Sequence, residues 1–330
     1  MGLQLCEKKI MKAAIINAFG EVPQYRDFLE PVVESNETLV RVKAAVLENF
    51  DKLTVAGTHY SSKKLYPAFP AVVGNDGVGV TEGGDLVAFG GIRQPHGAFA
   101  EQTVAGYTLP IPAGIDPAAA AAIPPSVLTS LLPLKYSARL QPGETVLING
   151  ATGVSGRIAV QVARLLGAGK IVGTGRNAAS LKIVSELGAD AVIDLGLPDE
   201  ELASAFVANE GPTGYDVVVD FLWGRPAEVL IRTFIPAEMG FAKRHIRYLA
   251  MGEKAGSNVS LPGAALRTSG LQLMGMGKLS HAVVFEEMAR IWEWMKEDTF
   301  FMEIERVPLA EIASAWVRED LAGKRLVVVM

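Results

Sequence analysis

The sequence is poor in the residues that several classes of protein require. Cys6 is the only cysteine among 330 residues, which excludes an intramolecular disulfide and a thiolate-rich zinc site. Lys and Arg total 31 against 36 Asp and Glu, a formal net charge of −5, and no basic block is longer than three residues. Such a chain has little with which to neutralise a phosphate backbone, so nucleic acid is not expected as a main partner.

Long uninterrupted apolar runs are missing as well. The longest apolar stretch, Ala118–Leu134, is broken by three prolines, and no unbroken run approaches the roughly 18 residues that a membrane span needs. The opening Met1–Cys6 carries Cys where a myristoylation signal has Ser or Thr, and it lacks the apolar core of a signal peptide. We therefore expect a soluble, cytoplasmic protein with no membrane partner, in which residues 1–10 precede a strand beginning at Met11.

The chain has the composition of a globular protein, with 49% hydrophobic residues and 34 scattered glycines. Its length predicts two domains, since single cores stop growing near about 250 to 300 residues. Residues 11–107 alternate short β-rich runs with Gly and Pro turns, which indicates a mostly β domain. An Ala-rich helix follows over 116–140, with Asp116 as N-cap and Pro117 at its first position. From Glu144 onward, apolar strands alternate with helices, as in a parallel sheet covered on both faces.

A glycine-rich turn in this second region points to the binding of a dinucleotide. Gly150, Gly153 and Gly156 follow the apolar strand VLIN and precede an amphipathic helix that starts near Arg157. In such a turn one glycine makes the tight exit from the strand, one lets backbone approach a pyrophosphate, and one lets the helix lie close to the strand. Backbone N–H groups at the helix N-terminus then face the phosphates.

The end of the next strand indicates which dinucleotide is bound. An NAD enzyme carries Asp or Glu about 20 residues after the glycines, whereas this sequence has Gly175, Arg176 and Asn177 there. A guanidinium can pair with a 2′-phosphate, so we expect NADP(H), with Arg176 on the phosphate or adenine and its two neighbours donating hydrogen bonds. The alternative is that Arg176 is a solvated turn residue.

Taken together, eight segments resemble the medium-chain dehydrogenase/reductase superfamily, in its zinc-lacking quinone oxidoreductase branch. They are MKAAII, FPAVVGNDGVGV, GAFAEQTVA, the Leu128–Ser130 helix, VLINGATGVSG, LKIVSELGADAVID, DVVVDFLWG and GKRLVVV. Zinc-dependent relatives carry Gly-His-Glu where this sequence has Gly74, Asn75 and Asp76, and their four-cysteine lobe is absent here. The four histidines are scattered along the chain, so we expect surface or core histidines and no metal site.

The resemblance implies an α/β protein with two domains. A GroES-like, mostly β catalytic domain would comprise residues 1–120 and 282–330, and a Rossmann NADP-binding domain residues 121–281. The late edge strand LQLMGMG would pair with its twofold mate in a homodimer. From the glycine turn, the second strand and the resemblance, the expected cofactor-binding residues are Thr129, Gly150, Thr152, Gly153, Val154, Gly156, Gly175, Arg176, Asn177, Phe221, Leu222, Met251, Gly252, Met274 and Met276.

The expected catalytic residues lie in the first domain. The resemblance places an aromatic hydroxyl at the substrate mouth, so Tyr60 or His59 could orient a carbonyl oxygen and deliver a proton; equally, the Tyr60 ring could merely pack at a domain edge. Asp51 could bond Tyr60 or cap a helix, and capping is the favoured role. The family's Asn-Pro-x-Asp motif appears here as Glu48 to Asp51, and its following tyrosine is Leu53.

The sequence therefore predicts an NADPH-dependent reductase of quinones or α,β-unsaturated carbonyls. Two alternatives stay open. One is a zinc-free alcohol or aldehyde reductase on the same scaffold. The other is a non-catalytic NADPH-binding protein, as in the lens crystallin of this family, which the departures at Glu48 and Leu53 favour.

Overall fold

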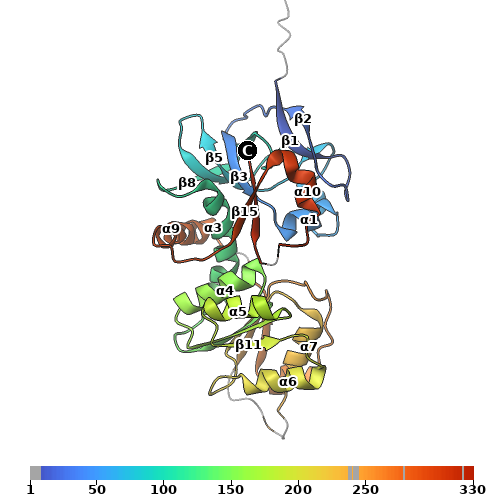
Figure 1. The fold of residues 1–330 in the computed structure, drawn as a ribbon, viewed down its shortest axis with the longest axis vertical. Coiled ribbons are helices and arrows are strands. Elements are labelled where there is room, and N and C mark those ends of the chain that lie inside the picture. Colours follow the sequence, from blue (N-terminus) through green and yellow to red (C-terminus); the bar gives the residue numbers. More distant parts are fainter. Residues whose placement is uncertain (1–8, 237–239, 241–244, 278, 322) are drawn as a thin grey trace, which may run out of the picture. The chain divides into compact units, whose positions relative to one another are not determined.

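The chain folds into two compact units in the computed structural model, which describes residues 9–236, 240, 245–277, 279–321 and 323–330 (Figure 1). One unit comprises Met1–Pro124 and Glu303–Met330, and the other Pro125–Met302. Cys6 and most of the expected N-terminal extension lie outside the described residues.

The first unit contains two β-sheets. The strands of the smaller sheet, in spatial order, are β2 (Gln24–Leu29), β1 (Ile10–Ile16) and β4 (Ala71–Val72). Those of the larger sheet are β15 (Ile304–Pro308), β16 (Arg325–Val329), β3 (Thr38–Val46), β5 (Gly77–Thr81), β6 (Leu86–Gly90) and β8 (Tyr107–Pro110), with β7 (Gln102–Ala105) also paired to β3. The helices of this unit are α1 (Asn49–Val55), α2 (Ser62–Leu65) and α10 (Ile312–Trp316), preceded by the 3₁₀ turn η2 (Leu309–Glu311).

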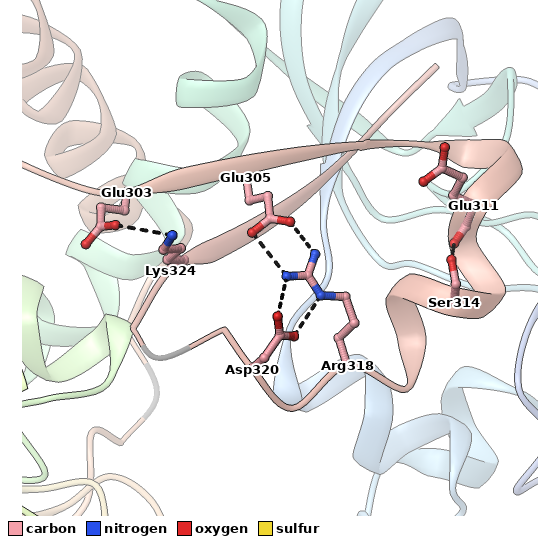
Figure 2. A network of polar contacts seen from close by, with 7 residues as sticks. All are labelled: Glu303, Glu305, Glu311, Ser314, Arg318, Asp320 and Lys324. Carbon is pink, nitrogen blue, oxygen red and sulfur yellow. Dashed lines mark hydrogen bonds and ion pairs between the residues drawn. The ribbon is translucent and has the colours of Figure 1, made fainter. Parts of the chain in front are cut away.

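The end of the chain belongs to the first unit. β16 runs antiparallel to β3, with Val327 opposite Val46, and parallel to β15. Ion pairs hold the segment that leads into β16: Figure 2 shows the Arg318 guanidinium between the carboxylates of Glu305 and Asp320. Apolar residues of both chain segments, among them Val328, then share one core.

The second unit contains a six-stranded sheet whose neighbouring strands are all parallel. In spatial order the strands are β11 (Ala191–Asp194), β10 (Lys170–Gly175), β9 (Thr145–Asn149), β12 (Val217–Asp220), β13 (Ile246–Ala250) and β14 (Leu271–Met274). The helices are α4 (Val154–Leu165), α5 (Ala178–Glu186), α6 (Asp199–Ala208), α7 (Gly224–Thr233), α8 (Gly263–Thr268) and α9 (His281–Lys296).

The parallel sheet forms because its central strands are apolar on both faces. Every residue of β9 and of β12 is buried, as the unbroken runs TVLIN and VVVD require. α4 packs against β9 and β10, α5 against β10 and β11, and α6 and α7 lie side by side (Figure 1). The predicted α/β fold class, with a mostly β unit and a Rossmann unit, is confirmed.

The boundaries of the two units differ from the expected ones. The first unit was expected to end at residue 120 and to resume at 282, whereas it ends at Pro124 and resumes at Glu303. The helix α9 (His281–Lys296) accordingly lies in the second unit, where it is held through the fully buried side chain of Glu287. This carboxylate accepts hydrogen bonds of 2.6 Å from Lys135 Nζ and Tyr136 Oη.

The Ala-rich helix runs across the unit boundary. It is α3 (Pro117–Leu132), continued by the π-helical turn η1 (Pro133–Ser137), and Asp116 caps its start by accepting from the backbone N–H of Ala119 at 3.0 Å. The 21 residues from Pro117 to Ser137 are long and apolar enough for a membrane span, but 67% of their most apolar window is buried inside the protein. Burial in the protein core accounts for this apolar character.

Candidate functional site

The strand order of the second unit places a topological switch point between β9 and β12. The chain proceeds from β9 outward through β10 to β11, then crosses back to the other side of β9 to form β12. In open parallel sheets the helices on the two sides of such a point diverge, which leaves a crevice outside the carboxyl ends of the strands where ligands bind. Three buried polar residues, Asn149, Thr174 and Asp220, lie at or next to the carboxyl ends of β9, β10 and β12.

The glycine turn lies directly at the switch point. Gly150 follows β9 with a φ of +89°, a conformation that glycine adopts without strain. A Cβ built on Gly156 would lie 2.2 Å from the Gly150 carbonyl oxygen and 2.6 Å from Ala151 Cα. The lack of a side chain at Gly156 therefore lets the first turn of α4 pack directly against the residues that follow β9.

Gly153 differs from these two glycines, because no described residue stands where its side chain would be. It is the exposed N-cap residue of α4, with an ordinary φ of −76°, and a Cβ built there would meet only the Gly150 oxygen, at 3.9 Å. The space beyond Gly153 is thus open, and the first backbone N–H groups of α4 border it. A pyrophosphate group fits this turn, since it needs close backbone approach and a helix N-terminus.

A buried hydrogen-bond network joins the carboxyl ends of four strands at this edge. Asp220, the last residue of β12, accepts from Asn149 Nδ2 at the end of β9 at 2.9 Å and from the hydroxyl of Tyr248 on β13 at 2.5 Å. The Asn149 side-chain oxygen in turn accepts from the Thr174 hydroxyl of β10 at 2.8 Å, and that hydroxyl also accepts from the backbone N–H of Gly150 at 3.0 Å. All four side chains are fully buried.

Asp220 also orders the loops that follow β12 and β13, the first through its side chain and the second through its backbone carbonyl. Its Oδ1 accepts from the backbone N–H groups of Leu222 and Trp223 at 2.7 and 3.0 Å, while the Asp220 carbonyl oxygen accepts from those of Met251 and Gly252. Burial raises the pKa of Asp220, against the opposing effect of these donors. The pKa of the Tyr248 hydroxyl is raised by burial and by the Asp220 carboxylate.

The sequence-based interpretation did not single out this network. A signal was present, since Asn149 and Asp220 are polar residues that close two otherwise apolar strands. What the sequence does not carry is the strand order that makes β9 and β12 neighbours.

The end of β10 carries the residues expected to select NADP(H). Gly175 leaves room for the Thr152 side chain, whose Cγ2 lies 2.2 Å from the position a Cβ would take. Arg176 is exposed and has no hydrogen-bond or ion-pair partner among the described residues. Asn177 caps α5, with its Oδ1 accepting from the backbone N–H of Ser180 at 2.9 Å, so its amide oxygen is already used.

The other expected cofactor residues are distributed along the same unit. Val154 is the first residue of α4, and Phe221 follows β12, where its backbone N–H donates to the Asn149 carbonyl oxygen at 3.0 Å. Leu222 lies against the glycine turn, since a Cβ on Gly150 would come within 2.9 Å of Leu222 Cγ. Gly252 packs tightly against the loop that follows β12, since a Cβ built on it would lie 2.6 Å from the Phe221 carbonyl oxygen.

Three expected residues lie elsewhere in the unit. The Thr129 hydroxyl donates to the Pro125 carbonyl oxygen at 2.7 Å, which is a contact within its own helix, α3. Met274 ends β14, the edge strand two positions beyond β12, and the exposed Met276 follows it. The Met276 carbonyl oxygen accepts from the Ser137 hydroxyl at 3.0 Å.

The loop after β12 contains a strained residue. Trp223 has a φ of +56° and a ψ of −156°, a region that glycine alone occupies readily, and the next residue, Gly224, has a φ of +58°. A side chain held in such a conformation costs about 1 to 3 kcal/mol, and strain of this kind persists where the surroundings enforce it.

Two of the expected catalytic residues of the first unit, His59 and Tyr60, belong to a cluster of three aromatic rings at the surface. The ring of His59 lies 4.0 Å from that of Tyr60 and 5.0 Å from that of Phe50, and Tyr60 is 94% exposed. His59 Nδ1 accepts from the backbone N–H of Ser61 at 3.1 Å, which assigns the proton of the neutral ring to Nε2. His59 therefore presents a donor, and the Tyr60 hydroxyl is open to solvent.

Asp51 is a capping residue in the structure. Its side chain is 4% exposed, and its carboxylate accepts from the backbone N–H of Glu48 at 2.9 Å, at the start of α1, and from Asn75 Nδ2 at 3.0 Å. No hydrogen bond joins it to Tyr60 among the described residues. Burial, with a smaller contribution from the Glu48 carboxylate, raises the pKa of Asp51 to about 8.

Within the described part of the chain, no three His, Cys, Asp or Glu side chains are grouped so that they could hold a metal ion. Asn75 and Asp76 stand where the zinc-dependent relatives have His and Glu, and the Asn75 amide donates to Asp51.

Comparison with known proteins identifies the family. The family model described as zinc-binding dehydrogenase matches residues 155–229, inside the second unit. Over 230 residues the chain is 30% identical to the quinone oxidoreductase of Rattus norvegicus, covering 65% of this chain and 67% of that protein. The chain belongs to the medium-chain dehydrogenase/reductase superfamily, in its quinone oxidoreductase-like branch.

Other relatives of this quinone oxidoreductase-like chain agree. A probable NADPH-dependent quinone reductase of Emericella nidulans is 30% identical over 228 residues, which span 65% of this chain and 62% of that protein, slightly less than two thirds of its length. The quinone oxidoreductase of Thermus thermophilus, whose structures include a complex with NADPH, is 27% identical with a TM-score of 0.77. That similarity covers 97% of this chain and 100% of the other.

The buried acid of the first unit predicts a pH dependence of stability. Between the ordinary pKa of 3.8 and about 8, folded Asp51 keeps a proton that the unfolded chain has released. The free energy of unfolding should therefore fall as pH rises through this window, by at most about 1.4 kcal/mol per pH unit from this group. Asp51→Asn should remove this slope. Urea unfolding of both proteins from pH 5 to 9 measures the difference, and parallel curves would contradict the assignment.

Proposed function

We propose that this member of the superfamily is an NADPH-dependent reductase that transfers a hydride to a quinone or an α,β-unsaturated carbonyl without using zinc. The observation that carries the proposal is the open glycine turn at the switch point, together with the exposed guanidinium of Arg176 at the end of the adjacent strand, which no other described residue engages. The named activities of the rat, fungal and bacterial relatives support it.

In this proposal the second unit holds the cofactor. The N–H groups at the start of α4 face the pyrophosphate beyond Gly153, and Arg176 pairs with the 2′-phosphate. NADPH supplies the hydride, so the protein has to orient the acceptor and provide a proton. His59 Nε2 and the Tyr60 hydroxyl are the proposed donors, because both are accessible and neither is engaged by a hydrogen bond among the described residues.

The assembly and the location of the protein are also proposals. β14 is an edge strand of the six-stranded sheet, with exposed Gln272 and Leu273, and the open edge of such a strand can pair with a second copy. This supports the expected homodimer. The cytoplasmic location stays a prediction.

The activity is tested by NADPH oxidation with 1,4-benzoquinone, 9,10-phenanthrenequinone, an alkenal, an enone and a simple ketone. Reduction of a quinone or of a C=C bond, unchanged by added zinc or by a chelator, is expected. Reduction of the ketone alone would favour the alcohol or aldehyde reductase. NADPH binding without turnover of any acceptor would favour the non-catalytic binding protein.

Two glycines of the turn give a matched pair of variants for the cofactor site. Gly153→Ala adds a methyl group only to the open space, so NADPH should bind at least tenfold more weakly while the free energy of unfolding stays within about 1 kcal/mol of the wild type. Gly156→Ala places the same methyl against backbone and should cost about 1 to 3 kcal/mol of stability as well.

Calorimetric titration with NADPH and urea unfolding measure both quantities. Unchanged affinity in a folded Gly153→Ala protein would contradict the location of the phosphates.

Arg176 provides the test of cofactor choice. Loss of a charge-assisted pair with the 2′-phosphate costs about 1.5 to 3 kcal/mol, so Arg176→Ala should lower the preference for NADPH over NADH at least tenfold, with NADH binding unchanged. Lys182→Ala on α5 is the control: its side chain is 78% exposed and approaches Glu186 at 3.9 Å, and it should alter neither affinity. Titrations with NADPH and NADH measure the two affinities. If Arg176→Ala kept the wild-type preference for NADPH over NADH, Arg176 would be excluded from the 2′-phosphate site.

A further inference from the structure

Trp223 combines a bulky side chain with a backbone conformation that suits glycine. Its φ of +56° and ψ of −156° are strained for a residue with a Cβ, and a glycine there would make the same turn without strain. Strained residues of this kind gather at binding and active sites. Since the backbone does not need an indole at this place, the side chain itself calls for an explanation.

The surroundings of Trp223 enforce its conformation from two sides. Its backbone N–H donates to Asp220 Oδ1 at 3.0 Å, and its ring meets the ring of Tyr248 edge to face, with centroids 6.1 Å apart. The Tyr248 hydroxyl binds the other oxygen of the same carboxylate. After it, Gly224 has no room for a side chain, since a Cβ would lie 2.5 Å from the Ala255 carbonyl oxygen. The indole is partly buried against the core of the unit.

The loop held in this way adjoins the glycine turn. Leu222, the residue before Trp223, packs on Gly150, and the Leu222 carbonyl oxygen accepts from the backbone N–H of Ala255 at 2.7 Å. β10, with Arg176 at its end, lies on one side of β9, and β12, with Trp223 after it, lies on the other. A dinucleotide with its pyrophosphate at α4 and its 2′-phosphate at Arg176 therefore extends its nicotinamide half toward the Trp223 loop.

We propose that Trp223 is a positioning residue for the nicotinamide half of the cofactor. Held by the hydrogen bond from its backbone N–H to Asp220 and by the contact of its ring with Tyr248, it fixes the Phe221–Leu222 segment beside the glycine turn, where that segment would border the nicotinamide riboside. The inference rests on the proposed NADPH site and adds to it a residue that acts through its neighbours. On this proposal the strain at Trp223 is retained because its ring holds the Phe221–Leu222 segment in place beside the glycine turn.

The test compares two ligands on four proteins: wild type, Trp223→Gly, Trp223→Phe and Asp298→Gly. NADPH carries both halves of the cofactor, whereas 2′,5′-ADP carries only the adenosine half with its 2′-phosphate. Asp298→Gly is the matched control, because it relieves another left-handed residue, with a φ of +51°, in the turn after α9. Affinities are measured by calorimetry at a temperature at which circular dichroism shows all four proteins folded.

The expected result for Trp223→Gly is NADPH binding weakened at least tenfold with 2′,5′-ADP binding changed less than twofold. Trp223→Phe, which keeps a ring beside Tyr248, should bind NADPH within about threefold of the wild type. Asp298→Gly should match the wild type with both ligands. The KM for NADPH should rise in Trp223→Gly with a smaller change in kcat at saturation.

Two results would overturn the role of Trp223. Equal weakening of both ligands would mean that the variant only loosens the unit, and unchanged NADPH binding would mean that the strain is incidental. If instead the wild type bound neither ligand, the proposed NADPH site would fail before Trp223 came into question.

Discussion

The structure of the second unit depends on one buried carboxylate, that of Asp220. Its side chain accepts from Asn149, from Tyr248 and from two backbone N–H groups of the following loop. Through Asn149 the network reaches Thr174, so the ends of β10, β9, β12 and β13 are joined at the edge where the glycine turn lies. A buried carboxylate is stable only when its oxygens are well supplied with donors, so the network makes this edge rigid before any ligand arrives. The open space at Gly153 and the strained Trp223 are both built on that edge.

Much of the fold could be predicted from the sequence because its local signals agree. From Glu144 onward, the apolar strands alternate with helices in one parallel sheet as expected, and the glycine turn lies between β9 and α4 as its spacing predicts. The place of α9 could not be predicted in the same way. Its amphipathic pattern identifies a helix. Its residue Glu287, however, binds Lys135 and Tyr136, which lie some 150 residues away in the sequence, and only the fold brings the three together.

The candidate site was predictable where a short motif contains the whole geometry. Gly150, Gly153 and Gly156 lie within one turn, and Arg176 and Asn177 lie at the end of one strand, where Asn177 uses its amide oxygen to cap α5; their roles toward the cofactor stay predictions. Asn149 and Asp220 become partners only when β9 and β12 pair, and a strained Trp223 has no sequence signature. In the first unit Asp51 caps α1, as favoured on sequence, while the rings of His59 and Tyr60 are in contact at the surface and their catalytic role stays a prediction.

Hydrogen–deuterium exchange with and without NADPH tests most directly the central claim, that the rigid edge around Asp220 receives the cofactor. The account predicts slower exchange on NADPH addition in peptides covering residues 149–156 and 220–224, with the helices α6 and α8 unchanged. A smaller effect is expected at 174–177, where the 2′-phosphate would bind. Protection confined to the first unit, or absent from both of the loops that flank the switch point while NADPH binds, would contradict it.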